Sequence, residues 1–333
     1  MNKRLVNSGS ARTVIVGGGT MGADVAIVLA RGGSLVTVVD PNAQQRARLL
    51  PHVSRELQTA GLGQRARNVR TVATLEEVEW HDVTLVVECI TEQLATKQAL
   101  FAALEAWSPA TAVLASNSSS FPISTISAGL NSRARMLGLH FFMPAHLVPL
   151  VEVVCGADSN AALAAWLCGF MRDCGSVPVL VRKDKPGFLA NRMQHALSRE
   201  AFALIDEGVA SAEDVDAAVR FGFGFRYLAA GPVLQRDHAG IDVHWAAAAT
   251  MYPTLSNTTE PARVLSERVV AGQLGMKTGQ GFYSWPEDKR NAERARYDEL
   301  LRQGLALLGP ELPPINRGDA PEHSTAPSSE ACS

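Results

Sequence analysis

The chain has 333 residues, 47% of them hydrophobic and 19% charged, with a formal net charge of −2. This composition is typical of a globular protein with room for two domains, and it gives no electrostatic reason to expect nucleic acid or an anionic membrane as partner. The five cysteines lack CxxC or metal-like spacing, and no apolar segment suggests secretion or a membrane span. We therefore expect reduced thiols, no metal site and a cytoplasmic protein.

The first part of the chain reads as strand, glycine turn, helix and strand over residues 12–40. "RTVIV" and "SLVTVVD" are apolar and rich in β-branched residues, and "GADVAIVLARGG" between them has helical spacing. Further strands are expected at "TLVVECI", "TAVLASN", "RMLGLH", "LVEVV" and "VPVLV", with helical segments between several of them. This alternation predicts an α/β fold with a Rossmann-like, mostly parallel sheet covered by helices.

The pattern becomes helical after "VRKDKPGF". "FLANRMQHALSREAFALIDEG" places its large apolar residues mostly on one face, and Ser211 and Asp214 have the spacing of a capping box for the next helix. We therefore expect a sheet domain over residues 1–183 and an all-helical domain over residues 184–308. The remaining residues, 309–333, are rich in proline and serine, which predicts a disordered tail.

A glycine-rich loop, "VIVGGGTMG", follows the first expected strand and opens the first expected helix. Its G-x-G-x-x-G spacing, in this context, is typical of a site for the pyrophosphate of a dinucleotide. The loop residues expected to contact the cofactor are Gly17, Gly19, Thr20, Met21 and Gly22. Asp40 ends the second strand, where a carboxylate binds ribose hydroxyls and repels a 2′-phosphate, so NAD is favoured over NADP. An ordinary glycine turn and an FAD-type domain are the alternatives.

Two ionisable residues interrupt the apolar stretch "MLGLHFFMPAHLVPLVEVV". His140 ends one expected strand, and Glu152 lies in the strand that follows a proline-bounded loop. Neighbouring strands lie about 4.8 Å apart, so the carboxylate can reach the imidazole. Such a pair fixes the tautomer of the histidine and would act as a general base for alcohol oxidation beside a nicotinamide. On spacing alone, a satisfied core histidine and an unrelated glutamate are the alternative.

Several segments together resemble the motifs of the L-3-hydroxyacyl-CoA dehydrogenase superfamily over about residues 12–285. In chain order they are "GGGTMG", "VVECITE", "SNSSS", "GLHFFMP", "LVEVV", "KDKPGFLANR" and "KTGQGFYSW". The resemblance implies a Rossmann-like NAD-binding domain followed by a helical domain through which the chain forms a homodimer. It also implies NAD-dependent oxidation of a secondary alcohol to a 3-oxo product.

The resemblance assigns catalytic roles to four residues. His140 matches the catalytic base and Glu152 matches its partner. Ser119 in "SNSSS" matches the serine that contacts the substrate oxygen. Asn191 matches the asparagine near the reacting carbonyl, and its expected place in the first turn of a helix adds positive potential there.

Three further residues are expected near the cofactor. Glu88 in "VVECITE" matches a glutamate near the nicotinamide ribose, and Asn117 begins the segment that carries Ser119. Lys97 lies on the helix after Glu88, where a solvated helix face is the alternative to a cofactor contact.

The chain departs from the fatty-acid pattern at three places. Met143 replaces the usual asparagine, and the excursion "RARLLPHVSRELQTAGLGQRARNVRTV" is short, lacks lysine and is interrupted by Pro51. "GFGFRYLAAGP" looks more like the lambda-crystallin (L-gulonate 3-dehydrogenase) and carnitine dehydrogenase branch. It places Arg226 where a guanidinium could bind the carboxylate of a free hydroxy acid. A surface or interface arginine is the alternative.

The sequence therefore leaves two substrate classes open, a small 3-hydroxy acid and a 3-hydroxyacyl-CoA. A non-catalytic NAD-binding or structural protein of the same fold is the alternative function.

Overall fold

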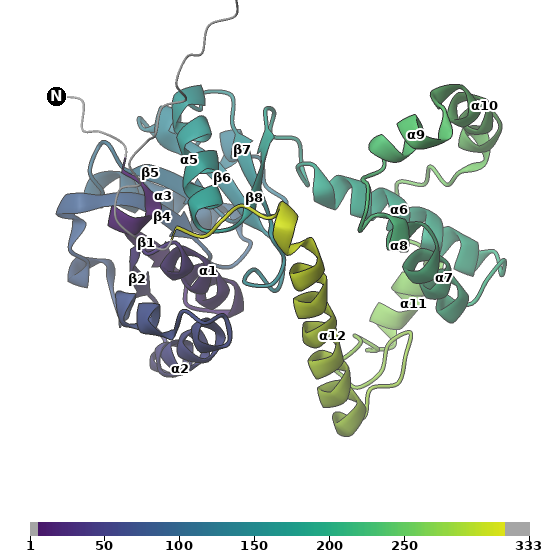
Figure 1. The fold of residues 1–333 in the computed structure, drawn as a ribbon, viewed down its shortest axis with the longest axis horizontal. Helices are drawn as coiled ribbons and strands as arrows, with labels where there is room; N and C mark the ends of the chain where they lie inside the picture. The colour runs from purple at the N-terminus through teal and green to yellow at the C-terminus, as the bar shows by residue number, and fades with distance from the viewer. Residues whose placement is uncertain (1–5, 317–333) are drawn as a thin grey trace, which may run out of the picture. The chain divides into compact units, whose positions relative to one another are not determined.

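The computed structural model describes residues 6–316, which form two compact units. One unit contains residues 6–188 together with residues 311–316, and the other contains residues 189–310. Figure 1 follows the chain from the strands of the first unit into the helices of the second. The prediction of an α/β domain followed by an all-helical domain is confirmed at the level of fold class.

The first unit is built on one eight-stranded sheet with the strand order β3-β2-β1-β4-β5-β6-β7-β8. All neighbouring strands are parallel except β6 and β7, which are antiparallel, so the prediction of a mostly parallel sheet is confirmed. The strands are β1 (Arg12–Val16), β2 (Leu35–Val39), β3 (Val69–Val72), β4 (Val83–Glu88), β5 (Val113–Ser116), β6 (Met136–Phe141), β7 (Leu150–Cys155) and β8 (Val177–Val181). The sequence did not predict β3, which is short and lies inside the arginine-rich excursion.

Helices cover both faces of this sheet (Figure 1). Side chains of α1 (Thr20–Arg31), α2 (Ala43–Thr59) and α5 (Ala161–Asp173) pack into one apolar cluster. Side chains of α3 (Leu94–Trp107) and α4 (Ile123–Ile126) pack into the other. Successive side chains of a strand point to opposite faces of the sheet, so strand β1 contributes to both clusters. Ile15 belongs to the first, and Val14 and Val16 belong to the second. The short 3-10 helices of this unit are Ser8–Ser10, Gly63–Asn68, Leu75–Glu77, Trp80–Asp82 and Arg133–Arg135.

Helix α2 continues through Pro51, although the sequence predicted an interruption there. A proline inside a helix removes one backbone hydrogen bond and crowds the preceding turn. Here the helix is held by an apolar face that includes Leu49, Val53 and Leu57, all buried against the sheet unit. This burial outweighs the local cost, and it keeps the residues on both sides of Pro51 in one helix.

The chain returns to the sheet unit after the helical unit. Ile315 packs against the core cluster of α1, α2 and α5. The backbone of Asn316 donates to the carbonyl of Asp173 at 2.9 Å and accepts from Arg65 Nη2 at 2.7 Å. The expected tail of residues 309–333 is therefore ordered by packing over 311–316, and its residues 317–333 lie outside the described residues.

The second unit is helical throughout its described elements. They are α6 (Ala190–Asp206), α7 (Ala212–Ala218), a π-helical turn (Val219–Phe223), α8 (Gly224–Arg226), α9 (Leu234–Ala239), α10 (Ile241–Met251), a 3-10 turn (Tyr252–Thr254), α11 (Arg263–Val270), α12 (Glu287–Leu308) and a closing 3-10 turn (Gly309–Glu311). The predicted capping box is confirmed, because Ser211 Oγ accepts from the Asp214 N–H at 3.1 Å and the Asp214 carboxylate accepts from Ser211 in return.

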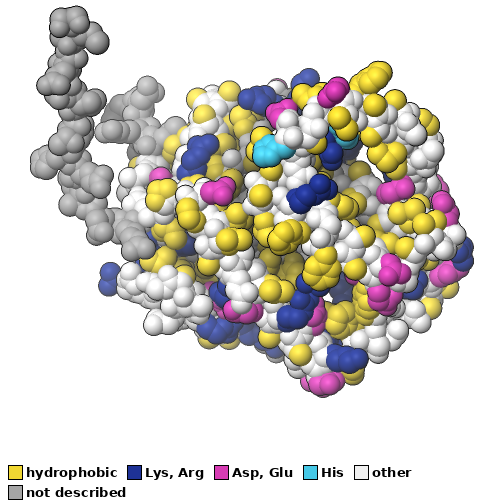
Figure 2. Space-filling model, turned by 45° about the vertical axis from the view of Figure 1, so that its right-hand side comes forward, with side chains coloured by type: hydrophobic (Ala, Val, Ile, Leu, Met, Phe, Trp, Pro, Cys, Tyr) yellow, Lys and Arg dark blue, Asp and Glu magenta, His cyan; other side chains and the backbone are white. Residues whose placement is uncertain are grey.

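Apolar side chains lie on the surface of this unit, and Val264 is the one apolar residue of residues 189–310 that is buried. Figure 2 shows hydrophobic side chains scattered over the face in view. The largest exposed ones in this unit include Phe221, Phe225, Val233, Ile241, Trp245 and Val270. Within the described residues, no helix has both the length and the apolar composition of a membrane span.

Candidate active site

The glycine loop between β1 and α1 is shaped by contacts that exclude side chains. Gly17 has φ +102°, and a Cβ there would lie 2.7 Å from the carbonyl oxygen of Cys89. A Cβ on Gly22 would lie 1.8 Å from the Gly17 oxygen, so this residue sets the close approach of α1 to the turn. A Cβ on Gly19 would meet nothing within 4 Å, and Gly19 is the N-cap of α1. The loop therefore offers open backbone at a helix N-terminus, which fits a pyrophosphate.

Asp40 lies beside this loop, directly after β2. One carboxylate oxygen accepts from the Gly18 N–H at 2.7 Å, and the other accepts from the Asn42 N–H at 2.8 Å. In the glycine loop itself, Thr20 is exposed at the start of α1. The next residue, Met21, packs against the core. The loop, the helix terminus and the carboxylate together fit the adenosine half of NAD.

His140 and Glu152 face each other across the antiparallel pair β6 and β7. They are direct partners in the strand register, and His140 Nδ1 lies 2.8 Å from Glu152 Oε2. His140 is 4% exposed and Glu152 is fully buried, and the imidazole packs edge-on against the rings of Phe142 and Phe188. An ionised carboxylate only accepts hydrogen bonds, so Nδ1 carries the proton and Nε2 keeps a free lone pair. The arrangement can take up a proton at Nε2.

Glu92 organises the serine loop, residues 117–120 after β5, and was not among the residues predicted from sequence. Its Oε1 accepts from the hydroxyls of Ser118 at 2.6 Å and Ser120 at 2.7 Å, and from the backbone N–H of Ser119 at 3.2 Å. Burial would raise the pKa of Glu92, but these hydrogen bonds and the nearby Lys97 outweigh it and lower the pKa to about 2. The signal was present in "VVECITE", whose last residue is this glutamate.

Ser119 itself is exposed, and its hydroxyl makes no hydrogen bond within residues 6–316. Its backbone is fixed by Glu92 while its side chain stays free. The residue is therefore held in place with a hydroxyl available to a ligand.

Lys97 is buried between carboxylates, which excludes the solvated helix face considered from sequence. Its Nζ lies 2.7 Å from Glu88 Oε1 and 3.1 Å from Glu92 Oε2, and Lys97 is 1% exposed. Glu88 is fully buried and accepts from Ser116 Oγ at 2.6 Å through its other oxygen. One ammonium group thus joins the end of β4 to the serine loop.

Asn117 connects the ends of three strands. Its N–H donates to the Glu88 carbonyl at 2.9 Å, and its side-chain oxygen accepts from the Phe141 N–H at 2.9 Å. These contacts lie at the carboxyl edge of β4, β5 and β6, where open parallel sheets bind ligands. Met143, which replaces the family asparagine, follows β6 and is 61% exposed.

Asn191 and Arg226 belong to the helical unit. Asn191 lies in the first turn of α6, as expected, and Arg226 ends α8 with an exposed side chain. His140 belongs to the sheet unit, so the roles of these two residues beside it stay predictions.

Two protein-family models match the chain. Residues 12–185 match the 3-hydroxyacyl-CoA dehydrogenase NAD binding domain, and residues 187–285 match the 3-hydroxyacyl-CoA dehydrogenase C-terminal domain.

Relatives span nearly the whole described chain. A 5-formyl-3-hydroxy-2-methylpyridine 4-carboxylate 5-dehydrogenase of Mesorhizobium japonicum is 33% identical over 87% of this chain and 97% of its own length. A probable 3-hydroxybutyryl-CoA dehydrogenase of Bacillus subtilis is 32% identical over 82% of this chain and 97% of its own length. A crystal structure of a 5-formyl-3-hydroxy-2-methylpyridine 4-carboxylic acid 5-dehydrogenase, described as an NAD⁺-dependent dismutase, is 30% identical and superposes with a TM-score of 0.85, covering 90% of this chain and 98% of that one.

The low pKa of Glu92 makes its contribution to stability depend on pH. The folded-state pKa of about 2 lies below the ordinary value of 4.5, so ionised Glu92 stabilises the fold above pH 4.5, and this stabilisation is lost as pH falls toward 2. We expect Glu92→Gln to lower the urea midpoint at pH 7 and the difference from wild type to shrink below pH 4.5. Glu311→Gln, at an exposed glutamate, is the control. Equal midpoints for Glu92→Gln and wild type at pH 7 would contradict this role.

Proposed function

Because the chain belongs to the 3-hydroxyacyl-CoA dehydrogenase family of NAD-dependent oxidoreductases, we propose that it oxidises a secondary alcohol to a 3-oxo product. The observation that carries this proposal is the buried His140–Glu152 pair at the edge of the sheet, 2.8 Å between nitrogen and oxygen. Burying an ionisable pair among apolar strands costs free energy, and a purely structural protein has no evident use for such a pair. The non-catalytic reading of the fold is therefore the weaker one.

Each catalytic residue has one task in the proposed reaction. Nε2 of His140 accepts the proton of the substrate hydroxyl, and Glu152 stabilises the imidazolium that forms. The hydroxyl of Ser119 and the amide of Asn191 hold the oxygen as it becomes a carbonyl. NAD, when bound, supplies the hydride acceptor. A positioned base of this kind contributes about 10²–10⁴-fold to the rate.

The proposed cofactor residues divide into those that contact NAD and those that position others. Gly17, Gly19, Thr20, Met21 and Gly22 form the loop under the pyrophosphate, and Asp40 lies where the adenosine ribose would bind. We assign Glu88 and Asn117 to the nicotinamide side. Lys97 is too deeply buried to offer a free donor, and it acts by holding Glu88 and Glu92.

Cofactor preference tests the place of Asp40. A carboxylate there repels a 2′-phosphate, so we expect kcat/KM for NAD⁺ to exceed that for NADP⁺ by well over tenfold, where tenfold corresponds to about 1.4 kcal/mol. Asp40→Asn keeps an acceptor for the Gly18 N–H and should lower the ratio of kcat/KM for NAD⁺ to kcat/KM for NADP⁺. Asp82→Asn, at an exposed aspartate, is the matched control. Comparable kcat/KM values for the two cofactors in the wild type would contradict the assignment.

Replacing the base tests the catalytic proposal directly. His140→Asn should lower kcat by at least about 10²-fold while the Kd for NADH changes little, because His140 is not part of the glycine loop. Glu152→Gln should also lower kcat, since it leaves the imidazolium without a charged partner. His81→Asn, at an exposed histidine, is the control. The base is misassigned if His140→Asn keeps most of the wild-type turnover. A wild type that binds NADH but oxidises no substrate in a broad panel of secondary alcohols would favour the non-catalytic alternative.

Two substrate classes fit the family. The Bacillus subtilis relative is named for a CoA thioester, whereas the Mesorhizobium japonicum relative is named for a free pyridine carboxylate. For this chain we favour a small free acid, because the helical excursion lacks lysine, Met143 replaces a polar residue and Arg226 is exposed in the helical unit. The narrower resemblance to the lambda-crystallin and carnitine dehydrogenase branch points the same way and stays a prediction.

Substrate assays with Arg226 variants separate the two classes. A bidentate guanidinium–carboxylate contact is worth about 1.5–3 kcal/mol, so Arg226→Met should raise KM for the preferred free acid about tenfold to a hundredfold. Arg226→Lys should restore only part of the affinity, because an ammonium lacks the planar fork. Arg294→Met is the control for loss of an exposed arginine in the same unit. The anchor would be excluded if a thioester such as 3-hydroxybutyryl-CoA were much the better substrate and Arg226→Met left its KM unchanged.

We also propose that the chain forms a homodimer through the helical unit. The support is the exposed apolar surface of that unit, including Phe221, Trp245 and Val270, which one chain leaves open to water. A solution mass of a single chain by light scattering would contradict it.

A further inference from the structure

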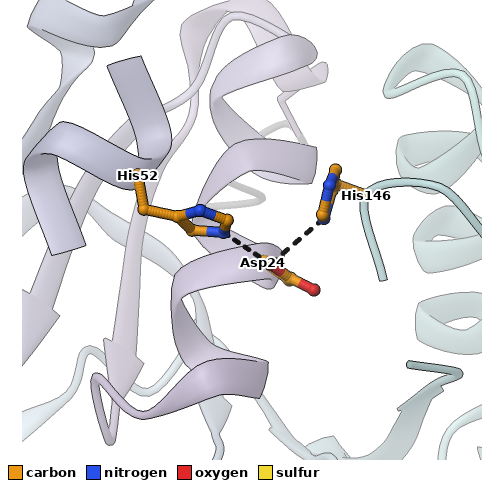
Figure 3. A group of neighbouring side chains, drawn as sticks. All are labelled: Asp24, His52 and His146. Carbon is orange, nitrogen blue, oxygen red and sulfur yellow. Dashed lines mark hydrogen bonds and ion pairs between the residues drawn. The ribbon is translucent and has the colours of Figure 1, made fainter. Parts of the chain in front are cut away.

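A second cluster of ionisable side chains lies in the sheet unit, apart from the His140–Glu152 pair. Asp24 comes from α1, His52 from α2 and His146 from the segment between β6 and β7, and their side chains converge in Figure 3. One potential ligand atom of each residue lies within 4.8 Å of the other two. The sequence predicted no metal site, because these residues are far apart along the chain and follow no motif.

Asp24 presents a single carboxylate oxygen to both histidines. Its side chain is 2% exposed, and its Oδ2 accepts from the Ala145 N–H at 3.0 Å. Its Oδ1 lies 2.9 Å from His52 Nε2 and 3.1 Å from His146 Nδ1. The Ala145 N–H therefore fixes the orientation of the carboxylate and leaves Oδ1 facing both histidines.

His146 leaves a buried nitrogen unsatisfied. Its side chain is 10% exposed, and its Nε2 lies 3.5 Å from the buried carboxylate of Glu56. Its Nδ1 has no hydrogen-bond partner of suitable geometry in the described chain, although Asp24 Oδ1 is close by. If Nε2 carries the proton toward Glu56, the lone pair of Nδ1 faces a carboxylate oxygen. Two acceptors at this separation repel each other unless a cation lies between them.

We propose that Asp24, His52 and His146 bind a divalent transition-metal ion, with zinc as the best match. Two imidazole nitrogens and one carboxylate oxygen form a typical three-residue zinc ligand set, with water completing a tetrahedron. Metal–ligand bonds of about 2.0–2.2 Å separate tetrahedral ligand atoms by about 3.4 Å. The present separations of 2.9 and 3.1 Å need to open by only a few tenths of an ångström. Glu56 fits the carboxylate that commonly accepts from the second nitrogen of a metal-bound histidine.

One contact opposes the metal. His52 Nδ1 lies 2.8 Å from Arg55 Nη2, and a donor at this nitrogen favours the tautomer that carries its proton on Nε2. For Nε2 to bind metal, Arg55 must release Nδ1. Its side chain is 65% exposed, and its Nε donates to Glu56 Oε1 at 3.0 Å, so Arg55 can leave Nδ1 while it stays paired with Glu56. The metal therefore competes with Arg55, which makes the site sensitive to this residue.

Metal binding would join three segments of the sheet unit. Helix α1 follows the glycine loop, α2 contains His52, and His146 lies in the segment after β6, which carries His140. A ligand that binds only the folded chain raises its stability by mass action. Zinc should therefore raise the unfolding temperature of the protein whether or not the proposed dehydrogenase reaction is correct.

Calorimetric titration of the full chain, freed of metal by a chelator, tests the site with zinc chloride as the probe. We expect one zinc ion per chain at pH 7.5 and a higher unfolding temperature when zinc is present. His146→Ala and His52→Ala should each weaken binding at least a hundredfold, and His52 is sufficiently exposed that its variant should fold even if the other does not. Arg55→Gln should bind zinc more tightly than the wild type.

The control is His81→Ala, because His81 and Asp82 form an exposed histidine–aspartate pair at 2.8 Å. Its removal should leave the zinc affinity of the chain unchanged. The proposal is overturned if the wild type shows no saturable binding up to about 100 µM zinc. It is also overturned if His52→Ala and His146→Ala bind zinc as tightly as the wild type, since the metal would then lie elsewhere.

Discussion

Burying an ammonium group in a protein costs several kcal/mol unless charged partners surround it. Lys97 meets this condition with Glu88 and Glu92, and the geometry of the candidate site follows from that contact. Glu88 fixes the end of β4 and receives Ser116 from β5, while Glu92 gathers the serine loop around one carboxylate oxygen. The charge network of Lys97, Glu88 and Glu92 thus positions the exposed hydroxyl of Ser119. The Ser119 side chain itself forms no hydrogen bond in that network.

The one antiparallel pair of the sheet has a comparable importance. Antiparallel neighbours place residues directly opposite each other, and a short connection suffices to join them. This register brings His140 and Glu152 face to face. If β7 had been added in parallel, a long crossover would have been needed, and the carboxylate would have had to come from another part of the chain.

Local pattern predicted most of the sheet and much of the site. The glycine loop, Asp40, and the two strands of the histidine–glutamate pair each carry their signal within a few residues, because turn chemistry and strand alternation are local properties. The burial of Lys97 could not be predicted, since a helical lysine reads as solvated unless the carboxylates opposite it are known. The same holds for Pro51 inside α2 and for Asp24 with its two histidines, where tertiary packing decides what the sequence pattern leaves open.

The return of residues 311–316 to the sheet unit has a consequence for how the protein is made. Ile315 and the backbone of Asn316 complete the packing around α5 and Arg65, yet they are synthesised after the entire helical unit. A ribosome-bound chain that has released only residues 6–188 therefore exposes part of an unfinished apolar surface. The sheet unit can reach its final packing only after the inserted helices have emerged. Its folding during translation therefore cannot finish before the helical unit has been synthesised.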